Sequence, residues 1–134
     1  MHITSFEDLL TAACQQAEPQ RLLFVFAGAE LADDSTPGQR ARFEAGEGGS
    51  LVPLMAVDKA ADELAGFDAL ELEARQFGKS WVIVFVAALS GQHGTPAGDD
   101  AVGRALDQMT ESIRQGRLSA YIPFDRQGQP VQFS

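Results

Sequence analysis

Cysteine is almost absent from this sequence, which has one, Cys14, among 134 residues. A single cysteine cannot form a disulfide within the chain, and it cannot supply a zinc ribbon, a zinc finger or a Cys-x-x-Cys redox site. Cys14 borders the apolar face of the first predicted helix, where a thiol packs as a small apolar side chain. One cysteine fits a reducing compartment, and no basic region precedes an apolar one at the N-terminus, so we expect a cytoplasmic protein without an export signal.

Basic side chains are also scarce. Ten lysines and arginines stand against 19 aspartates and glutamates, for a formal net charge of −9. A field of that sign repels phosphate backbones and anionic lipid, so we exclude nucleic acid and membranes as primary partners. The excess of acid is typical of a soluble domain, because like charges keep small proteins apart.

Long hydrophobic runs, internal repeats and low-complexity linkers are missing as well. The apolar stretch Trp81–Leu89 has nine residues, far fewer than a membrane-spanning helix needs. Its β-branched and aromatic residues are apolar on both alternating faces, which predicts a central strand covered on both sides. Without repeats or linkers, residues 1–134 are expected to form one domain around one core.

Two further apolar stretches, Leu22–Ala27 and Leu51–Val57, have the length of strands. Pro53 places the second at a sheet edge or marks its entry, because proline cannot donate a ladder hydrogen bond. Near the C-terminus, Tyr121–Phe124 and Pro130–Phe133 flank a turn with Asp at its first position and Gly at its fourth. These two stretches predict a C-terminal β-hairpin.

Helix signals precede and separate these strands. The capping-box spacing of Thr4-Ser-Phe-Glu7 starts a helix near Ser5, which Pro19 ends. Asp58 would cap a helix whose apolar stripe runs to Phe77, and Asp99 or Asp100 would cap a last helix that stops at Gly116.

Residues 37–45 admit two structures. Thr36-Pro-Gly-Gln39 supplies an N-cap, a proline at the first helical position and a glutamine three residues after the cap, which favours a short helix through about Glu44. The alternation of Ala41, Phe43 and Ala45 with charged residues fits a strand instead. We prefer the helix.

This order of elements predicts an α/β fold, a single domain with a mixed sheet of about five strands and helices packed on it. Right-handed crossovers would make the strands at Leu22, Leu54 and Trp81 mainly parallel, with the C-terminal hairpin antiparallel.

Candidate ligand-binding residues follow from that topology. The carboxyl ends of parallel strands meet at one edge of a sheet, which would bring together Glu30, Asp58, Lys59, Ser90 and His93. Glu30 and Asp58 offer oxygen ligands for a hard divalent cation, and His93 could act as a base. An N-capping aspartate and a solvated loop histidine explain the same residues more simply.

The loop from Ser90 to Asp100 is the segment predicted to be most mobile, and it would be the functional surface for a small ligand. Its glycines do not have the spacing of a phosphate-binding loop, and the two aspartates that end it would repel phosphate from the helix start. No Gly-x-Ser-x-Gly elbow surrounds Ser90, so Ser90 and His93 do not form a nucleophile and base pair. We predict no catalytic residue, metal site or cofactor.

The chain contains four stretches that resemble a group of short proteobacterial proteins of unknown function. They are Leu22–Leu31, Leu51–Lys59, Val84–Gly91 and Ile122–Val131. Members of that group are often labelled ribonucleotide reductase subunit alpha. The label implies nucleotide reduction through a cysteine-based radical in a large barrel, with redox cysteines to reset it. A chain of 134 residues with one cysteine cannot house that machinery, so the resemblance implies at most an accessory partner.

Two functions remain from the sequence. The first is a non-catalytic binding or interaction module, expected to be a homodimer because the terminal stretch Val131-Gln-Phe133 has no charge to discourage pairing between sheet edges. The alternative is a small enzyme or metal-dependent ligand binder that uses Glu30, Asp58 and His93 in a crevice.

Overall fold

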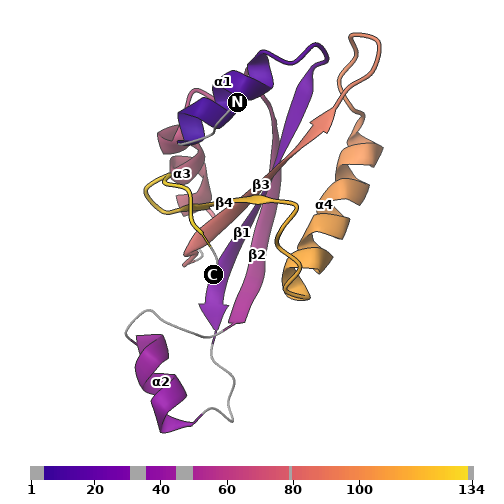
Figure 1. Cartoon of the computed structure of the whole chain (residues 1–134). Coiled ribbons are helices and arrows are strands. Elements are labelled where there is room, and N and C mark those ends of the chain that lie inside the picture. Colours follow the sequence, from indigo (N-terminus) through magenta and orange to yellow (C-terminus); the bar gives the residue numbers. More distant parts are fainter. Residues whose placement is uncertain (1–4, 31–35, 45–49, 79, 133–134) are drawn as a thin grey trace.

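A computed structural model describes residues 5–30, 36–44, 50–78 and 80–132, which form a single α/β domain (Figure 1). The elements in chain order are α1 (Phe6–Cys14), β1 (Gln20–Glu30), α2 (Pro37–Glu44), β2 (Ser50–Ala60), α3 (Phe67–Arg75), β3 (Ile83–Ser90), α4 (Asp99–Arg114) and β4 (Ile122–Asp125). None of the described helices is long and apolar enough to cross a membrane.

The four strands form one open sheet in the order β2-β1-β3-β4, and every neighbouring pair is antiparallel. The prediction of a mixed sheet of about five strands, with β1, β2 and β3 parallel, is therefore wrong. The reason lies in α2, which the sequence correctly predicts as a helix. A crossover helix must bury an apolar face on the sheet, whereas Pro37–Ala41 are exposed and α2 lies beyond the end of the sheet (Figure 1).

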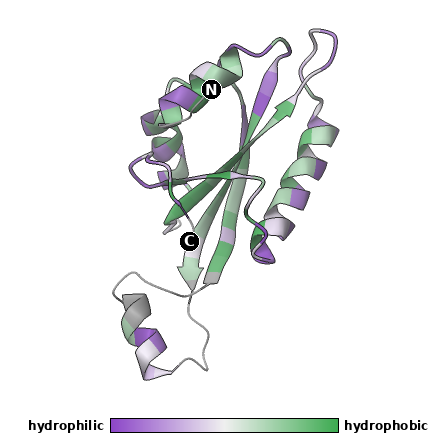
Figure 2. Cartoon of the chain, viewed as in Figure 1, coloured by the Kyte–Doolittle hydropathy of each residue, from purple (hydrophilic) through white to green (hydrophobic). Residues whose placement is uncertain are grey.

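Helices cover both faces of the sheet, so the domain has three layers (Figure 1). On one face, α1 and α3 pack on a cluster rich in aromatic residues, and α4 packs on the other face over β1 and β2. Figure 2 shows the apolar residues concentrated in the strands, while α4 alternates between hydrophobic and hydrophilic residues. Leu22–Ala27 of β1 and Ile83–Val86 of β3 are buried on both alternating faces, which confirms the predicted cover for these residues, and Val84 is fully buried. Residues 87–90 of β3 alternate between half-buried and exposed, so the cover on both sides ends at Val86.

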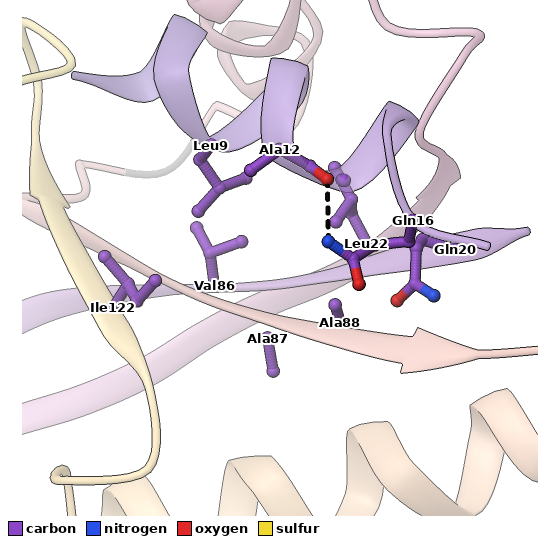
Figure 3. Close-up of a pocket in the computed structure, with 10 residues that line it drawn as sticks. Leu9, Ala12, Gln16, Gln20, Leu22, Val86, Ala87, Ala88 and Ile122 are labelled. Atoms are coloured by element: carbon purple, nitrogen blue, oxygen red, sulfur yellow. Dashed lines mark hydrogen bonds between the residues drawn. The ribbon is translucent and has the colours of Figure 1, made fainter. Parts of the chain in front are cut away.

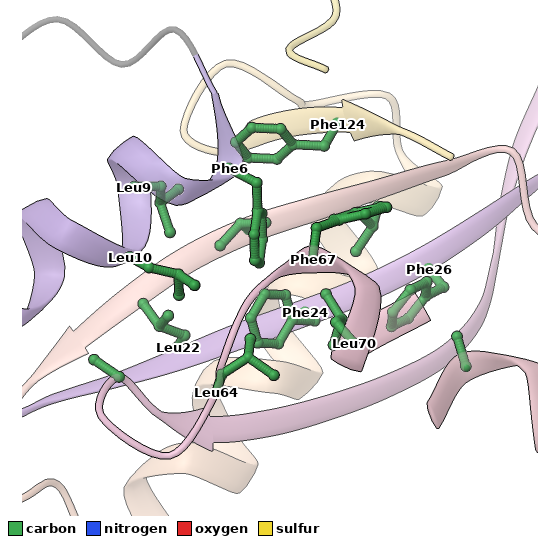
Figure 4. Packing of buried hydrophobic residues seen from close by; sticks show 14 of the residues in the cluster. Phe6, Leu9, Leu10, Leu22, Phe24, Phe26, Leu64, Phe67, Leu70 and Phe124 are labelled. Atoms are coloured by element: carbon green, nitrogen blue, oxygen red, sulfur yellow. The ribbon is translucent and has the colours of Figure 1, made fainter. Parts of the chain in front are cut away.

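Phe6 joins three elements on the aromatic face (Figure 4). Its ring lies 5.2 Å from that of Phe67 in α3 and 5.3 Å from that of Phe124 in β4, both in edge-on geometry. Such contacts contribute about 0.5–1.5 kcal/mol each beyond the area they bury. Trp81, predicted as the first residue of the central strand, precedes β3 and packs edge-on against Phe26 at 5.0 Å.

The predicted helix from Asp58 to Phe77 is wrong at its start. Asp58 and Lys59 belong to β2, where they pair with Leu23 and Leu22 of β1, and α3 begins only at Phe67 after Gly66. An aspartate before an apolar stripe is a local signal, and the pairing with β1 overrides it.

The other helix ends differ by a few residues from those predicted. Ser5 is the N-cap of α1 and accepts a hydrogen bond from the Asp8 N–H at 3.1 Å, and α1 ends at Cys14, well before Pro19. Thr4 lies outside the described residues. Helix α4 has Gly98 as its N-cap, and Asp99 and Asp100 occupy its first turn, where carboxylates favour the positive end of the helix dipole.

The C-terminal hairpin is confirmed for its first strand and its turn. The Asp125 carboxylate accepts hydrogen bonds from the backbone N–H groups of Gln127 and Gln129, and Gly128 has a positive φ of 78°. The predicted second strand is reduced to one bridge between Phe124 and Pro130, and its last residue, Phe133, lies outside the described residues.

Candidate functional site

The residues predicted to share one crevice lie at opposite ends of the sheet. Because β1 is antiparallel to both neighbours, the carboxyl ends of β2 and β3 lie beside the amino end of β1. Asp58 and Ser90 are therefore at one end, whereas Glu30 pairs with Ser50 at the other. The structure places the backbone of Glu30 at the opposite end of the sheet from Asp58, so the described strands do not bring these two residues to one crevice.

Asp58 forms part of an ion-pair cluster on the α4 face. The Arg21 guanidinium donates to the Asp58 carboxylate through Nε at 3.1 Å and also through Nη2, and its Nη1 donates to Asp99 at 2.9 Å and to the Ala97 carbonyl at 3.0 Å. The hydrogen bonds to Asp99 and Asp58 raise the pKa of Arg21. These contacts tie β1, β2 and the start of α4 together, so the Asp58 carboxylate is already neutralised within the fold.

Lys59 points to the opposite face of the sheet. Its ammonium group lies 2.8 Å from the Glu73 carboxylate of α3, and that hydrogen bond raises the pKa of Lys59. The pair joins the edge strand β2 to α3. Asp58 and Lys59 are thus neighbours in sequence but belong to two separate ion pairs, one on each side of the sheet.

The loop after β3 folds back as a tight turn rather than an open connection. Gln92 and Thr95 exchange two backbone hydrogen bonds of 2.9 Å, which leaves His93 and Gly94 as the two turn residues, both with positive φ. That combination is the two-residue hairpin geometry that matches the twist of antiparallel strands. The His93 side chain is exposed at the tip, away from the sheet.

The same loop is anchored to the start of β1. Gly91 donates to the Pro19 carbonyl at 2.8 Å, and the Glu18 carboxylate accepts from the Gly94 N–H at 3.0 Å. A side chain at Gly91 would collide with the Thr95 carbonyl oxygen at 2.1 Å. The glycines here permit a compact turn.

A hollow of about 270 Å³ lies between α1 and the carboxyl end of β3 (Figure 3). Its lining is mostly apolar and comes from α1, β1, β3 and the start of β4: Leu9, Ala13, Leu22, Val86, Ala88 and Ile122. Gln16 and Gln20 add amide groups at one end, and Gln20 donates to the Ser90 hydroxyl at 3.0 Å. Ser90 is therefore the one predicted site residue that contacts the lining of this hollow.

A second hollow, of about 490 Å³, continues around the end of α1 and shares Ala13, Gln16 and Gln20 with the first. It runs past Cys14 to Asp62. Cys14 is exposed and its thiol lies 3.5 Å from the Ala61 carbonyl, so the prediction that it packs as an apolar side chain is wrong.

Sequence reasoning missed the first hollow, although a signal for it exists. Strand β3 changes from the bulky Val84-Phe-Val86 to the small Ala87 and Ala88. Small side chains on a strand leave space beneath a covering helix. In Figure 3, Val86 and Ala88 point toward α1, and Ala87 points away from it.

The carboxyl end of β3 is also a free sheet edge. Strand β4 pairs with β3 only from Ile83 to Val86. The bond from Gly91 to Pro19 identifies a hydrogen-bonded pair with the segment leading into β1. Along an antiparallel ladder, hydrogen-bonded pairs alternate with pairs that are not hydrogen-bonded. Ala87 and Leu89 are therefore hydrogen-bonded to β1, whereas the backbone N–H and C=O of Ala88 point away from β1. No described residue pairs with them.

The residues that line the first hollow carry apolar or amide side chains and no titratable group. Within the described ranges no group of three or more His, Cys, Asp or Glu could hold a metal ion, and no charged side chain there is buried. The shifts resolved among those residues belong to Arg21, Lys59 and Arg75, and ion pairing moves each of them to higher pKa.

What the site offers a ligand is therefore an outward backbone edge beside an apolar hollow. Comparison of the chain with protein-family models, with curated proteins and with solved structures finds no match.

Proposed function

We propose that the chain is a non-catalytic binding module that takes an extended peptide segment along the free end of β3. One observation carries the proposal: the outward N–H and C=O of Ala88 lie next to an apolar hollow that opens between α1 and the sheet. An added strand gains its affinity from main-chain hydrogen bonds and its specificity from pockets that receive alternate side chains.

The hollow defines the segment that fits. Its apolar lining suits an aliphatic or aromatic side chain, and every second residue of an added strand would face it. The amides of Gln16 and Gln20 can bond to the peptide backbone or to a polar neighbour. The net charge of −9 attracts cationic partners, so we expect an apolar residue flanked by lysine or arginine.

Selection from a random linear peptide library displayed on phage tests the proposal with a defined probe. Enriched peptides should share an apolar residue, bind in solution, and lose binding when their alternate backbone amides are N-methylated. Ala88→Pro should abolish binding, because proline removes the outward N–H and leaves the bonds from Ala87 and Leu89 to β1 intact.

Ala56→Pro is the matched control, since it makes the same change on the opposite edge strand and should leave peptide affinity unchanged. A library that enriches no peptide would contradict the proposal. So would peptides that bind the Ala88→Pro protein as well as the original, or that tolerate N-methylation.

A further inference from the structure

We infer that a second copy of this chain pairs with the outer edge of β2. Strand β2 has eleven residues and forms one edge of the sheet. At the opposite edge, β4 is covered by the chain that follows it, because Val131 donates to the Pro123 carbonyl at 3.0 Å. No described residue pairs with the outer side of β2, so its main-chain groups are available to another strand.

The direction of each main-chain group on β2 follows from one hydrogen bond. Ala61 donates to the Gln20 carbonyl at 3.0 Å, which makes this a hydrogen-bonded pair with β1. Hydrogen-bonded pairs recur at every second residue of the ladder, so the N–H and C=O of Lys59, Val57 and Met55 point toward β1. The same groups of Ala56 and Asp58 point outward.

The open window on β2 has two ends. Pro53 has no N–H, and the pairing with β1 shifts at that point, between Phe26 and Ala27. At the other end, the outward N–H of Ala60 is already bonded to the Glu63 carboxylate at 2.6 Å. Between these limits Ala56 and Asp58 are the residues whose outward N–H groups are free, and Val57 is their midpoint.

A second copy fits this window because an antiparallel pair of identical strands is symmetric about a two-fold axis. With the axis at Val57, Ala56 of each copy faces Asp58 of the other, and these residues exchange N–H and C=O bonds. The register uses the outward groups at the centre of both windows.

Charge and size at the edge agree with this register. Edge strands are commonly blunted by charged side chains, but the Asp58 carboxylate is held by Arg21 and the Lys59 ammonium by Glu73. Neither residue faces its own copy across the axis. Ala56 is exposed and small, so it leaves room for the partner strand.

The proposed dimer leaves the peptide site open. The sheet order places β2 and the free end of β3 on opposite sides of β1, so strand pairing at β2 does not cover the hollow beneath α1. The two proposals can therefore fail separately. Loss of the dimer with intact peptide binding would remove this inference alone.

Sedimentation equilibrium of the full chain at micromolar concentration tests the dimer. The expected mass is twice the 14.4 kDa of one chain. Ala56→Pro should weaken the dimer roughly thirtyfold or more, because it removes one interchain hydrogen bond from each copy. Ala88→Pro, the same change on the other edge, should leave it unaffected. Added salt should tighten the dimer, since it screens the repulsion between two chains of charge −9.

A disulfide trap fixes the register independently of how well Ala56→Pro folds. In a Cys14→Ser background, Val57→Cys should form a covalent dimer under mild oxidation, because residue 57 faces itself across the axis. Met55→Cys should not, since residue 55 then faces Lys59 of the other copy. A monomeric parent protein at these concentrations would overturn the inference. So would a dimer that survives Ala56→Pro, or one in which Val57→Cys fails to cross-link.

Discussion

The two edge strands of the sheet differ in whether another part of the chain covers them. Strand β4 has four residues, and the chain turns back over it with bonds from Asp125 to the Gln129 carbonyl and from Val131 to the Pro123 carbonyl. Strand β2 has eleven residues and ends the sheet without such a cover. An uncovered edge is a template for another strand, so the difference locates where this domain can associate.

Strand β4 is also shorter than β3, and this difference leaves the end of β3 free for the proposed peptide. Because β4 pairs with only the first half of β3, Ala88 is left at a free edge beside the apolar hollow. One edge is thus long and self-complementary, whereas the other offers a short gap next to a pocket. The first suits a second copy and the second suits a peptide.

The largest expected effect comes from the strand between the two edges. Val84→Asp should prevent folding, because an unpaired carboxylate in a fully buried position costs several kcal/mol, a large share of the roughly 5–15 kcal/mol that stabilises a domain. Circular dichroism and thermal melting measure this loss. Val82→Asp is the control, since Val82 is 46% exposed and should tolerate the change. A cooperatively melting Val84→Asp protein would contradict the buried position of β3.

Gly128→Ala should loosen the cover over β4. Gly128 has a positive φ, and an added Cβ would lie 2.9 Å from the Phe67 ring, so we expect a loss of about 2–4 kcal/mol in the free energy of unfolding. Gly94→Ala has the same φ but no atom within 4 Å of the added Cβ, so it should cost only about 1 kcal/mol. Urea unfolding compares the two, and equal losses would show that the contact with Phe67 is unimportant.

A pair of proline substitutions sharpens the description of the β2 edge. Val57→Pro should lower the free energy of unfolding by about 2–4 kcal/mol, because it removes an N–H that bonds to β1 and leaves the Phe24 carbonyl without a partner. Ala56→Pro should cost under about 1 kcal/mol in the monomer, since its N–H faces outward. Urea unfolding at low protein concentration separates the two. A larger loss for Ala56→Pro than for Val57→Pro would mean that the N–H of Ala56 points toward β1, and it would remove the basis of the proposed dimer.

The smallest expected effect is an alkaline dependence at the β2 edge. The bond to Glu73 raises the pKa of Lys59, so the stability from this pair is complete below the pKa of an unfolded lysine and is lost as the pH rises through the higher pKa of the folded state. Melting temperatures of the parent and of Lys59→Met should therefore converge above pH 10.5. If the difference between the two melting temperatures stays constant as the pH rises through and above 10.5, Lys59 acts through the packing of its aliphatic stem and not through the ion pair.

Local signals in the sequence were sufficient for several elements. The apolar stretches at Leu22, Leu54 and Val84 are strands, and the Thr36-Pro-Gly-Gln39 pattern does start a helix, with the Thr36 hydroxyl accepting from the Gln39 N–H at 3.2 Å. The turn at Asp125 likewise follows from its aspartate and glycine. Each of these features depends on residues a few positions apart, so it can be recognised without knowing the rest of the fold.

The candidate site could not be predicted in the same way. Glu30, Asp58 and His93 were grouped on the assumption of parallel strands, and the antiparallel sheet separates Glu30 from the others. Asp58 lies in an extended β2 because β1 offers a longer pairing surface than its own apolar stretch indicates. Of the predicted residues, Ser90 alone contacts the lining of the hollow, through Gln20.

By itself, the sequence determined which segments are apolar, where the chain turns, and that nothing in the composition requires a disulfide. The tertiary structure alone decided the direction of the strands, which edge stays open, and the hollow beneath α1. The physical reason is that strand pairing and helix covering join residues far apart in the chain. Gln20 donates a hydrogen bond to Ser90, and β2 pairs with β1, only after the intervening chain has packed on one face of the sheet.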